Sequence, residues 1–182
     1  MISMNGLLYV LVAYAIGGIL TAYILTKWKH HADIRELGSG NPGARNMGRV
    51  YGKGYFAVTF VGDALKGAIV VYIATFVSEE ESFLFLSLLA VILGHLYPIW
   101  TKFSGGKGIS TFIGGLLVLD ILVTLTLAAL FVVLYALSRS FTKAGLLTIT
   151  SLPIVMLVFD YTMACIMLAL LIIGFISYAH RK

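Results

Sequence analysis

A glycine-rich segment at residues 38–49 combines backbone freedom with polar side chains. It reads Gly-Ser-Gly-Asn-Pro-Gly-Ala-Arg-Asn-Met-Gly-Arg. Glycine permits positive φ and lets neighbouring backbone N–H groups approach a ligand, which can create an anion-binding nest. We expect Gly38, Gly40 and Gly43 to shape such a nest, with Gly43 at positive φ in a turn that follows Pro42. The segment is therefore a candidate phosphate-binding loop.

The side chains of the same segment supply hydrogen-bond donors and positive charge. Ser39, Asn41 and Asn46 can donate hydrogen bonds, Arg45 adds a positive charge, and the planar guanidinium of Arg49 suits a phosphate. The segment is not a Walker A loop, because no Gly-Lys-Ser/Thr sequence closes it. A flexible loop at the membrane surface, rich in ordinary turn residues, is the alternative interpretation.

A second glycine loop, at residues 105–108, leads directly into an apolar segment. It consists of Gly105, Gly106, Lys107 and Gly108. A glycine-rich turn at a helix N-terminus can cradle phosphate with its free N–H groups, and the lysine adds a point charge. The alternative is a capped helix start with a lysine that extends to the membrane interface. Two such loops on one face of the protein favour anion binding more than either loop alone.

Three polar residues within the apolar segments are candidates for a supporting role. Asp63 and Lys66 are three residues apart on one helical face, where they can form an ion pair. Such a pair at membrane depth can serve function or only structure, and the sequence supports both interpretations equally. His95, shortly before the second glycine loop, can contact a ligand or brace its helix through a hydrogen bond.

Neither a metal site nor a protein nucleophile is evident in the sequence. The histidines are dispersed, and carboxylates do not cluster on the basic side of the chain. The nucleophile motif Gly-x-Ser-x-Gly is absent, and the single cysteine, Cys165, lies in an apolar run. We therefore expect no metal and no cofactor, and an enzyme of this kind would act through positioning and electrostatics.

Long apolar stretches connect these segments and indicate an integral membrane protein. The chain is 60% hydrophobic and 12% charged, with a mean hydropathy of +0.99, against roughly 25% charged in soluble domains. The stretch at residues 109–138 is too long for one crossing of about 30 Å, and Asp120 favours a break within it. We predict a single all-α domain, residues 1–182, with about seven transmembrane helices. The apolar stretches are residues 6–26, 55–77, 83–100, 109–138, 144–159 and 162–178.

The charges alternate between the two ends of these stretches. Lysine and arginine concentrate at residues 27–53, 102–107, 139–143 and 181–182. The opposite ends hold the acidic residues at 79–81, 120 and 160 and no lysine or arginine. The positive-inside rule makes the basic side cytoplasmic, so we expect the N-terminus outside and the C-terminus inside. Treating residues 109–119 as a re-entrant helix would reverse this pattern and is disfavoured. We expect lipid as the surroundings and no nucleic-acid partner.

Four motifs, taken in order, resemble those of a known enzyme family. They are Gly38-Ser-Gly-Asn-Pro-Gly-Ala-Arg-Asn46, Gly62-Asp-Ala-Leu-Lys-Gly67, Gly94-His-Leu-Tyr-Pro98 and Gly105-Gly-Lys-Gly108. Together they resemble the motifs of the bacterial acyl-phosphate-dependent glycerol-3-phosphate acyltransferases, the PlsY family, and the similarity covers most of the chain. The resemblance implies seven transmembrane helices in the bacterial cytoplasmic membrane, with the active site at the cytoplasmic face. It also implies transfer of a fatty acyl group from acyl phosphate to the 1-hydroxyl of glycerol 3-phosphate, giving lysophosphatidic acid for phospholipid synthesis.

The resemblance also assigns roles to particular residues. It implies catalytic or phosphate-binding roles for Ser39, Asn41, Asn46, Arg49, Lys107 and His180, and for Arg139 and Thr142 in a third motif. This chain differs from the family pattern at Arg45, Ser104 and Gly145, where the family has threonine, lysine and serine. We expect a monomer. Two alternatives stay open, a small transporter for an anionic solute and a divergent, inactive relative with a binding role.

Overall fold

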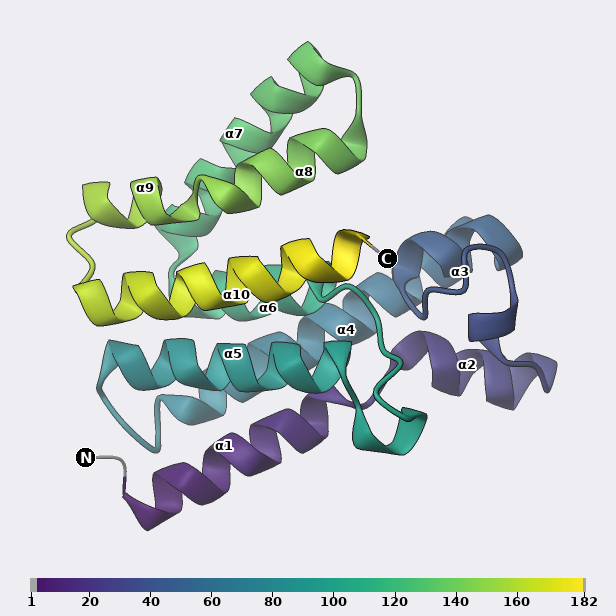
Figure 1. The fold of residues 1–182 in the computed structure, drawn as a ribbon, viewed down its shortest axis with the longest axis horizontal. Coiled ribbons are helices and arrows are strands. Elements are labelled where there is room, and N and C mark those ends of the chain that lie inside the picture. The colour runs from purple at the N-terminus through teal and green to yellow at the C-terminus, as the bar shows by residue number, and fades with distance from the viewer. Residues whose placement is uncertain (1–2, 182) are drawn as a thin grey trace.

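The computed structural model describes residues 3–181, and this part of the chain is a bundle of helices without strands (Figure 1). Short 3₁₀ turns at Ile34–Glu36 and Ile99–Thr101 interrupt two of the connections. The α-helices are α1 (Met4–Gly17), α2 (Thr21–His30), α3 (Ala44–Tyr51), α4 (Lys53–Ala74), α5 (Glu81–Leu96), α6 (Ile109–Leu119), α7 (Ile121–Ser138), α8 (Phe141–Thr150), α9 (Leu152–Val158) and α10 (Met163–Arg181). The predicted all-α fold of a multi-pass membrane protein is confirmed, while the count of seven spans stays a prediction.

Length and composition allow four to six membrane spans in the described residues. Helices α4, α7 and α10, and α5 extended to Thr101, are each long and apolar enough to cross a bilayer. Two further candidates are bent pairs, α1 with α2 at 41° and α8 with α9 at 42°. Helix α6 is apolar but has only 11 residues. A seventh span would require this short helix to cross the membrane.

The predicted break at Asp120 is confirmed and has a clear physical cause. The Asp120 carboxylate caps α7, since Oδ1 accepts hydrogen bonds from the backbone N–H groups of Leu122 at 2.7 Å and Val123 at 3.0 Å. Its other oxygen, Oδ2, accepts a hydrogen bond from the Tyr161 hydroxyl at 2.8 Å. The carboxylate therefore stabilises a helix start instead of lying unpaired in the bilayer.

The break between α1 and α2 was not predicted, because residues 6–26 were expected to form one helix. Helix ends leave backbone carbonyls without partners, and distant side chains supply those partners here. Trp100 Nε1 donates to the carbonyl oxygen of Gly18 at 2.8 Å, and Lys66 Nζ donates to that of Ile19 at 2.8 Å. These two contacts make the bend stable inside the bundle.

Glycines allow helices α4 and α6 to cross at backbone contact distance. A Cβ atom on Gly67 would lie 2.1 Å from the carbonyl oxygen of Thr111, and one on Gly114 would lie 1.9 Å from that of Ala64. Small residues permit such close crossings in membrane proteins. The contact fixes the start of α6, and with it the second glycine loop, against α4.

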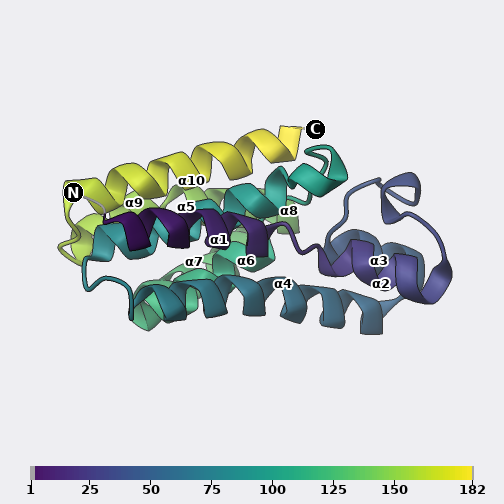
Figure 2. The ribbon, with the colours of Figure 1, turned by 90° about the horizontal axis from the view of Figure 1, so that it is seen from below.

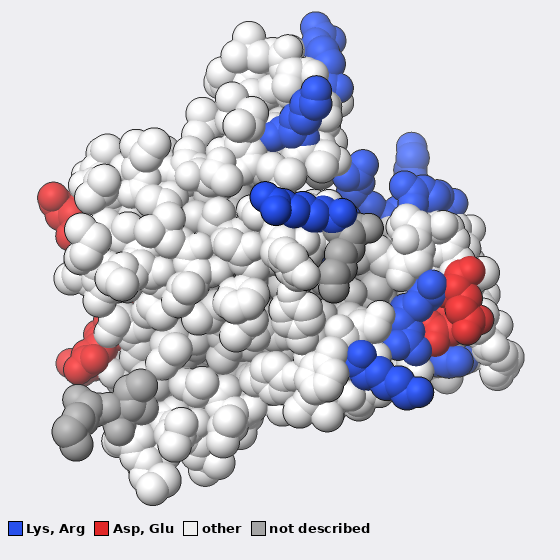
Figure 3. Space-filling model, in the orientation of Figure 1, with Lys and Arg blue, Asp and Glu red and all other residues white. Residues whose placement is uncertain are grey.

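Charged residues separate toward opposite ends of the bundle (Figure 3). Lysine and arginine side chains gather at the end where α2, α3 and the C-terminal end of α10 lie, and acidic patches lie at the other end (Figures 1 and 3). Seen from below, α2 and α3 extend beyond the main bundle at the basic end (Figure 2). Asp33 and Glu36 are acidic exceptions near α2, and Lys182 lies outside the described residues. The arrangement agrees with the predicted charge asymmetry.

Candidate active site at the basic end

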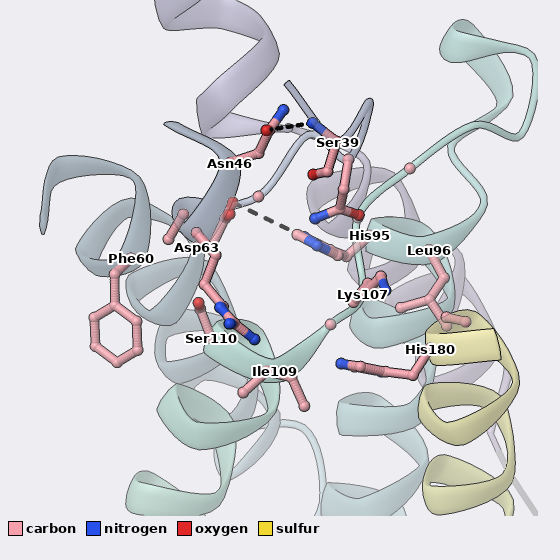
Figure 4. A pocket seen from close by; sticks show the side chains of 18 of the residues that line it. Ser39, Asn46, Phe60, Asp63, His95, Leu96, Lys107, Ile109, Ser110 and His180 are labelled. Atoms are coloured by element: carbon pink, nitrogen blue, oxygen red, sulfur yellow. Dashed lines mark hydrogen bonds and ion pairs between the residues drawn. The ribbon is translucent and has the colours of Figure 1, made fainter. Parts of the chain in front are cut away.

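A cavity of about 680 Å³ opens at the basic end of the bundle. Both glycine-rich segments contribute to its lining, together with parts of α4, α5, α6, α8 and α10. Figure 4 shows His95, Lys107 and His180 approaching this space from α5, the second glycine loop and α10. Residues far apart in the sequence therefore meet in one site, as anion binding by both glycine-rich loops requires.

The first glycine-rich segment is braced by the side chain of Asn46. Asn46 Oδ1 accepts a hydrogen bond from the backbone N–H of Ser39 at 2.8 Å, and its Nδ2 donates to the carbonyl oxygen of Leu37 at 2.8 Å. Asn46 is 1% exposed. A Cβ on Gly38, which has φ of 59°, would lie 2.3 Å from Asn46 Oδ1. Asn46 therefore shapes the loop that presents Ser39 and Asn41 to the cavity.

Two expectations for this segment need correction. Residues 44–49 are not loop, because α3 begins at Ala44 and carries Arg45, Asn46 and Arg49. Gly43 has φ of −135° and ψ of 169°, an extended conformation open to any residue, so the expected positive φ is wrong. Gly43 caps the N-terminus of α3, and the positive φ values occur at Gly38 and Gly40.

The two arginines of α3 lie at the cavity in different settings. Arg45 donates through Nη1 to Thr142 Oγ1 at 2.8 Å, and its guanidinium lies 5.5 Å from the centre of the Phe141 ring. Arg49 Nη1 lies 3.4 Å from Asn46 Oδ1, a long contact that leaves most of its fork free. Arg45 thus links α3 to α8 across the cavity, whereas Arg49 can reach a ligand.

The second glycine loop is fixed to the C-terminal end of α5. The backbone N–H of Gly105 donates to the carbonyl oxygen of Leu96 at 3.1 Å, and that of Gly106 donates to the carbonyl oxygen of His95 at 3.0 Å. Gly108 has φ of 80° and precedes the first residue of α6. This left-handed conformation favours glycine. The loop therefore opens into a helix, as predicted, with Lys107 lining the cavity.

An arginine ties the two glycine-rich regions together. Arg35 Nη2 forms a 2.7 Å ion pair with Asp33 Oδ2, and Arg35 Nη1 donates to the carbonyl oxygen of Thr101 at 3.0 Å. The hydrogen bond from Arg35 holds the pKa of Asp33 below its usual value. The first connection thereby contacts the turn that leads into the second glycine loop.

Three helix N-termini meet at the cavity, those of α3, α6 and α8. The lining includes Ala44 and Arg45 of α3, Ile109 and Ser110 of α6, and Thr142 of α8. The first N–H groups of a helix have no acceptor within the helix and carry partial positive charge. With Arg45, Arg49 and Lys107 they create a site suited to more than one phosphate.

His180 approaches the cavity from the last turn of α10 in a defined orientation (Figure 4). Its Nδ1 lies 2.9 Å from the carbonyl oxygen of Ile176. A carbonyl only accepts hydrogen bonds, so Nδ1 carries a proton, and Nε2 of the neutral ring is an acceptor. His180 can therefore orient a substrate hydroxyl group.

The cavity contains most of the residues that the sequence singled out, with three exceptions. Gly38 packs against the Asn46 side chain but does not line the cavity. Lys66 is also absent from the lining, and it contacts two lining residues, Asp63 and His95. Arg139 ends α7 with φ of 51°, donates through Nε to the carbonyl oxygen of Ala136, and is not part of the lining. The predicted ion pair of Asp63 and Lys66 is present at 3.0 Å.

Sequence reasoning did not identify the apolar part of the lining. We call it the apolar wall, and it consists of Phe56, Phe60, Ile113, Phe141 and Leu146. These residues lie on α4, α6 and α8, and they line the same cavity as the cationic side chains and the two glycine-rich segments. In the sequence they look like any lipid-facing residues of apolar helices, so only the packing of the helices distinguishes them.

Comparisons with known proteins agree with this geometry. The sequence profile of the glycerol-3-phosphate acyltransferase family matches residues 7–182. The chain is 57% identical to glycerol-3-phosphate acyltransferase 1 of Bacillus thuringiensis subsp. konkukian over 182 residues, which is 100% of both chains. It is 39% identical to glycerol-3-phosphate acyltransferase 1 of Desulfitobacterium hafniense, covering 99% of this chain and 89% of that protein.

A solved structure extends the comparison to three dimensions. The crystal structure of PlsY (YgiH), an integral membrane glycerol 3-phosphate acyltransferase in its glycerol 3-phosphate form, superposes with a TM-score of 0.89. The two chains are 32% identical, and the match covers 97% of this chain and 88% of that one. A second structure of the same enzyme, in its lysophosphatidic acid form, gives a TM-score of 0.87. The chain belongs to the glycerol-3-phosphate acyltransferase family.

Proposed function

We propose that this protein transfers a fatty acyl group from acyl phosphate to the 1-hydroxyl of glycerol 3-phosphate. The products are lysophosphatidic acid and inorganic phosphate. One observation carries the proposal, namely that phosphate-binding groups and the apolar wall line the same cavity. Both substrates carry a phosphate, and acyl phosphate also carries a hydrocarbon chain, so the cavity offers matching chemistry to each part.

The cationic groups and free N–H groups bind the two phosphates in this proposal. Lys107 and the N-terminus of α6 hold one phosphate, and Arg49 with the N-terminus of α3 holds the other. Arg45 adds charge at the rim while it remains joined to Thr142. The apolar wall receives the acyl chain, whose burial away from water is favourable.

The reaction needs no protein nucleophile, because acyl phosphate is already an activated anhydride. The 1-hydroxyl oxygen attacks the acyl carbon, the bond from that carbon to the phosphate oxygen breaks, and the leaving phosphate takes up the hydroxyl proton. His180 Nε2 accepts a hydrogen bond from this hydroxyl and orients it. Among the described residues, no hydrogen bond joins the Ser39 hydroxyl to a histidine that could activate it. Positioning and charge stabilisation supply the rate.

The proposed setting is the bacterial cytoplasmic membrane, with the basic end and its cavity toward the cytoplasm. The positive-inside rule supports this orientation, since lysine and arginine gather at the end of the bundle where the cavity lies. Glycerol 3-phosphate would then enter from the aqueous side, and the acyl donor would enter from the lipid along the apolar wall. The protein would act as a monomer.

A donor comparison tests the proposal. Purified protein in nanodiscs is incubated with glycerol 3-phosphate and palmitoyl phosphate, palmitoyl-CoA or palmitoyl-acyl carrier protein, and lysophosphatidic acid is measured by mass spectrometry. We expect product only with palmitoyl phosphate. Product formed from a thioester but not from palmitoyl phosphate would refute the donor assignment, and no product from any donor would favour an inactive relative.

The transporter alternative has less support in the geometry. A path through the bilayer would need accessible polar groups, yet Asp63, Lys66 and His95 are buried and bonded to one another. Uptake of radiolabelled glycerol 3-phosphate into proteoliposomes tests this alternative directly. We expect uptake no faster than into liposomes without protein.

A further inference from the structure

The buried ammonium group of Lys66 determines the protonation of a neighbouring histidine. Lys66 Nζ lies 2.8 Å from the carbonyl oxygen of Ile19, 3.0 Å from Asp63 Oδ1 and 2.8 Å from His95 Nδ1. An ammonium group has three N–H donors and accepts no hydrogen bond. Three neighbours therefore match three donors, and His95 Nδ1 must be the acceptor in its pair.

The other neighbours of His95 Nδ1 agree with this assignment. The Thr111 hydroxyl lies 3.3 Å from Nδ1 and can only donate to it if Nδ1 has no proton. Asp63 Oδ1 is 3.9 Å from Nδ1, beyond hydrogen-bond distance, and accepts from Thr21 at 3.0 Å instead. The imidazole is therefore neutral, with its single proton on Nε2.

The Nε2–H group of His95 is left as a fixed donor at the cavity. His95 is 3% exposed and lines the cavity, and no hydrogen bond involves Nε2 among residues 3–181. The atom is open to the cavity and carries an N–H group, so a bound ligand can accept a hydrogen bond from it. A Cβ atom on Gly106 would lie 2.1 Å from His95 Nε2. Glycine at position 106 therefore keeps Nε2 accessible from the cavity.

We infer that His95 is a catalytic residue that donates a hydrogen bond from Nε2 to an oxygen of the phosphorylated substrate bound at the second glycine loop. Lys66 is a positioning residue, because its hydrogen bond to Nδ1 holds the proton on Nε2. The inference rests on the proposed function. The oxygen is either the carbonyl oxygen of acyl phosphate, which gains negative charge during transfer, or a phosphate oxygen of glycerol 3-phosphate.

Two substitutions at one position separate this role from a purely structural one. The amide nitrogen of His95→Gln can reach the place of Nε2 and keep the donor toward the cavity. The amide oxygen of His95→Asn can reach the place of Nδ1 and keep the acceptor for Lys66, but the amide nitrogen of this shorter side chain then lies near the place of Cδ2 and does not reach that of Nε2. If His95 only braced its helix through Lys66, the asparagine variant would be the better enzyme.

We expect the opposite order of activity. His95→Asn should lower kcat/KM about 100- to 1000-fold, the effect of losing one oxyanion donor, and His95→Gln should stay within about tenfold of wild type. Calorimetric titration with glycerol 3-phosphate then identifies the oxygen. Weaker binding by His95→Asn assigns the acceptor phosphate, and unchanged binding with lower kcat assigns the acyl carbonyl. His31→Asn, an exposed position with φ of 50° that asparagine tolerates, is the control and should match wild type.

Asparagine that is as active as glutamine, or more active, would overturn the inference. If neither variant folds, nitrogen NMR of wild-type protein with ¹⁵N-labelled histidine rings decides the question without catalysis. We expect His95 in the Nε2–H form and His180 in the Nδ1–H form, and His95 with its proton on Nδ1 would contradict the account. Failure of the proposed function would instead appear as wild-type protein that makes no lysophosphatidic acid, whatever the form of His95.

Discussion

Substitution of Gly106 by alanine adds one methyl group at the contact between the second glycine loop and His95. The new Cβ would lie 2.1 Å from His95 Nε2, well inside the normal contact distance. The buried His95 ring is held at Nδ1 by Lys66, so the loop or the ring must shift by about 1 Å. A displacement of this size can cost about 100-fold in rate when it moves groups that position a substrate.

We therefore expect Gly106→Ala to lower kcat/KM by about 100-fold while the protein remains folded. The assay is initial-rate formation of lysophosphatidic acid from palmitoyl phosphate and glycerol 3-phosphate in nanodiscs, with thermal unfolding measured in parallel. Gly174→Ala is the matched control, because a Cβ at Gly174 meets nothing within 4 Å, and it should keep wild-type activity. Wild-type kcat/KM for Gly106→Ala would refute the view that this contact sets the geometry of the site.

Three further predictions concern the phosphate-binding groups and the membrane orientation. Lys107→Ala should reduce turnover tenfold to a thousandfold through loss of a charge near the transition state, and unchanged turnover in the folded variant would remove Lys107 from the site. Arg49→Ala should raise the KM for a phosphorylated substrate, as measured by initial rates. Arg49→Lys should restore little activity, because an ammonium group lacks the planar arrangement of donors in guanidinium, and full activity of this variant would exclude bidentate binding. Cysteines introduced at Glu80 and Arg139 should react with an impermeant reagent from opposite sides of the membrane, outside and inside respectively, and labelling from one side would exclude the proposed topology.

Features with a local cause could be predicted from the sequence. Asp120 interrupts an apolar stretch, and a carboxylate that caps a helix avoids the cost of burial in lipid, so the break follows from a single residue. The ion pair of Asp63 and Lys66 follows from their spacing on one helix. The second glycine loop precedes a helix because Gly108 can adopt positive φ.

Features that depend on distant contacts could not be predicted. The bend between α1 and α2 is stabilised by Trp100 and Lys66, which lie 47 or more residues away along the chain. Helix α3 has only eight residues, and its contacts with α4 and the hydrogen bond from its Asn46 to Leu37 compensate for the low stability of a short helix. The same short helix gives Gly43 a capping role instead of a turn with positive φ.

The apolar wall and the donor at His95 also required the three-dimensional arrangement. Phe56 and Ile113 belong to helices with apolar residues all round, so their contact with the cavity has no signature in the sequence. The orientation of the His95 proton depends on the meeting of α4 and α5. In both cases the residue type was visible, but its neighbours were not.

In the proposed reaction, the acyl group passes directly from acyl phosphate to glycerol 3-phosphate, with no covalent acyl-enzyme. A single-turnover experiment tests this direct transfer. Excess purified protein is mixed with radiolabelled palmitoyl phosphate, with or without glycerol 3-phosphate, and the released phosphate and the protein-bound label are measured. We expect one inorganic phosphate for each lysophosphatidic acid, no phosphate release in the absence of glycerol 3-phosphate, and no label on the protein. Release of phosphate together with labelled protein before glycerol 3-phosphate is added would contradict direct transfer.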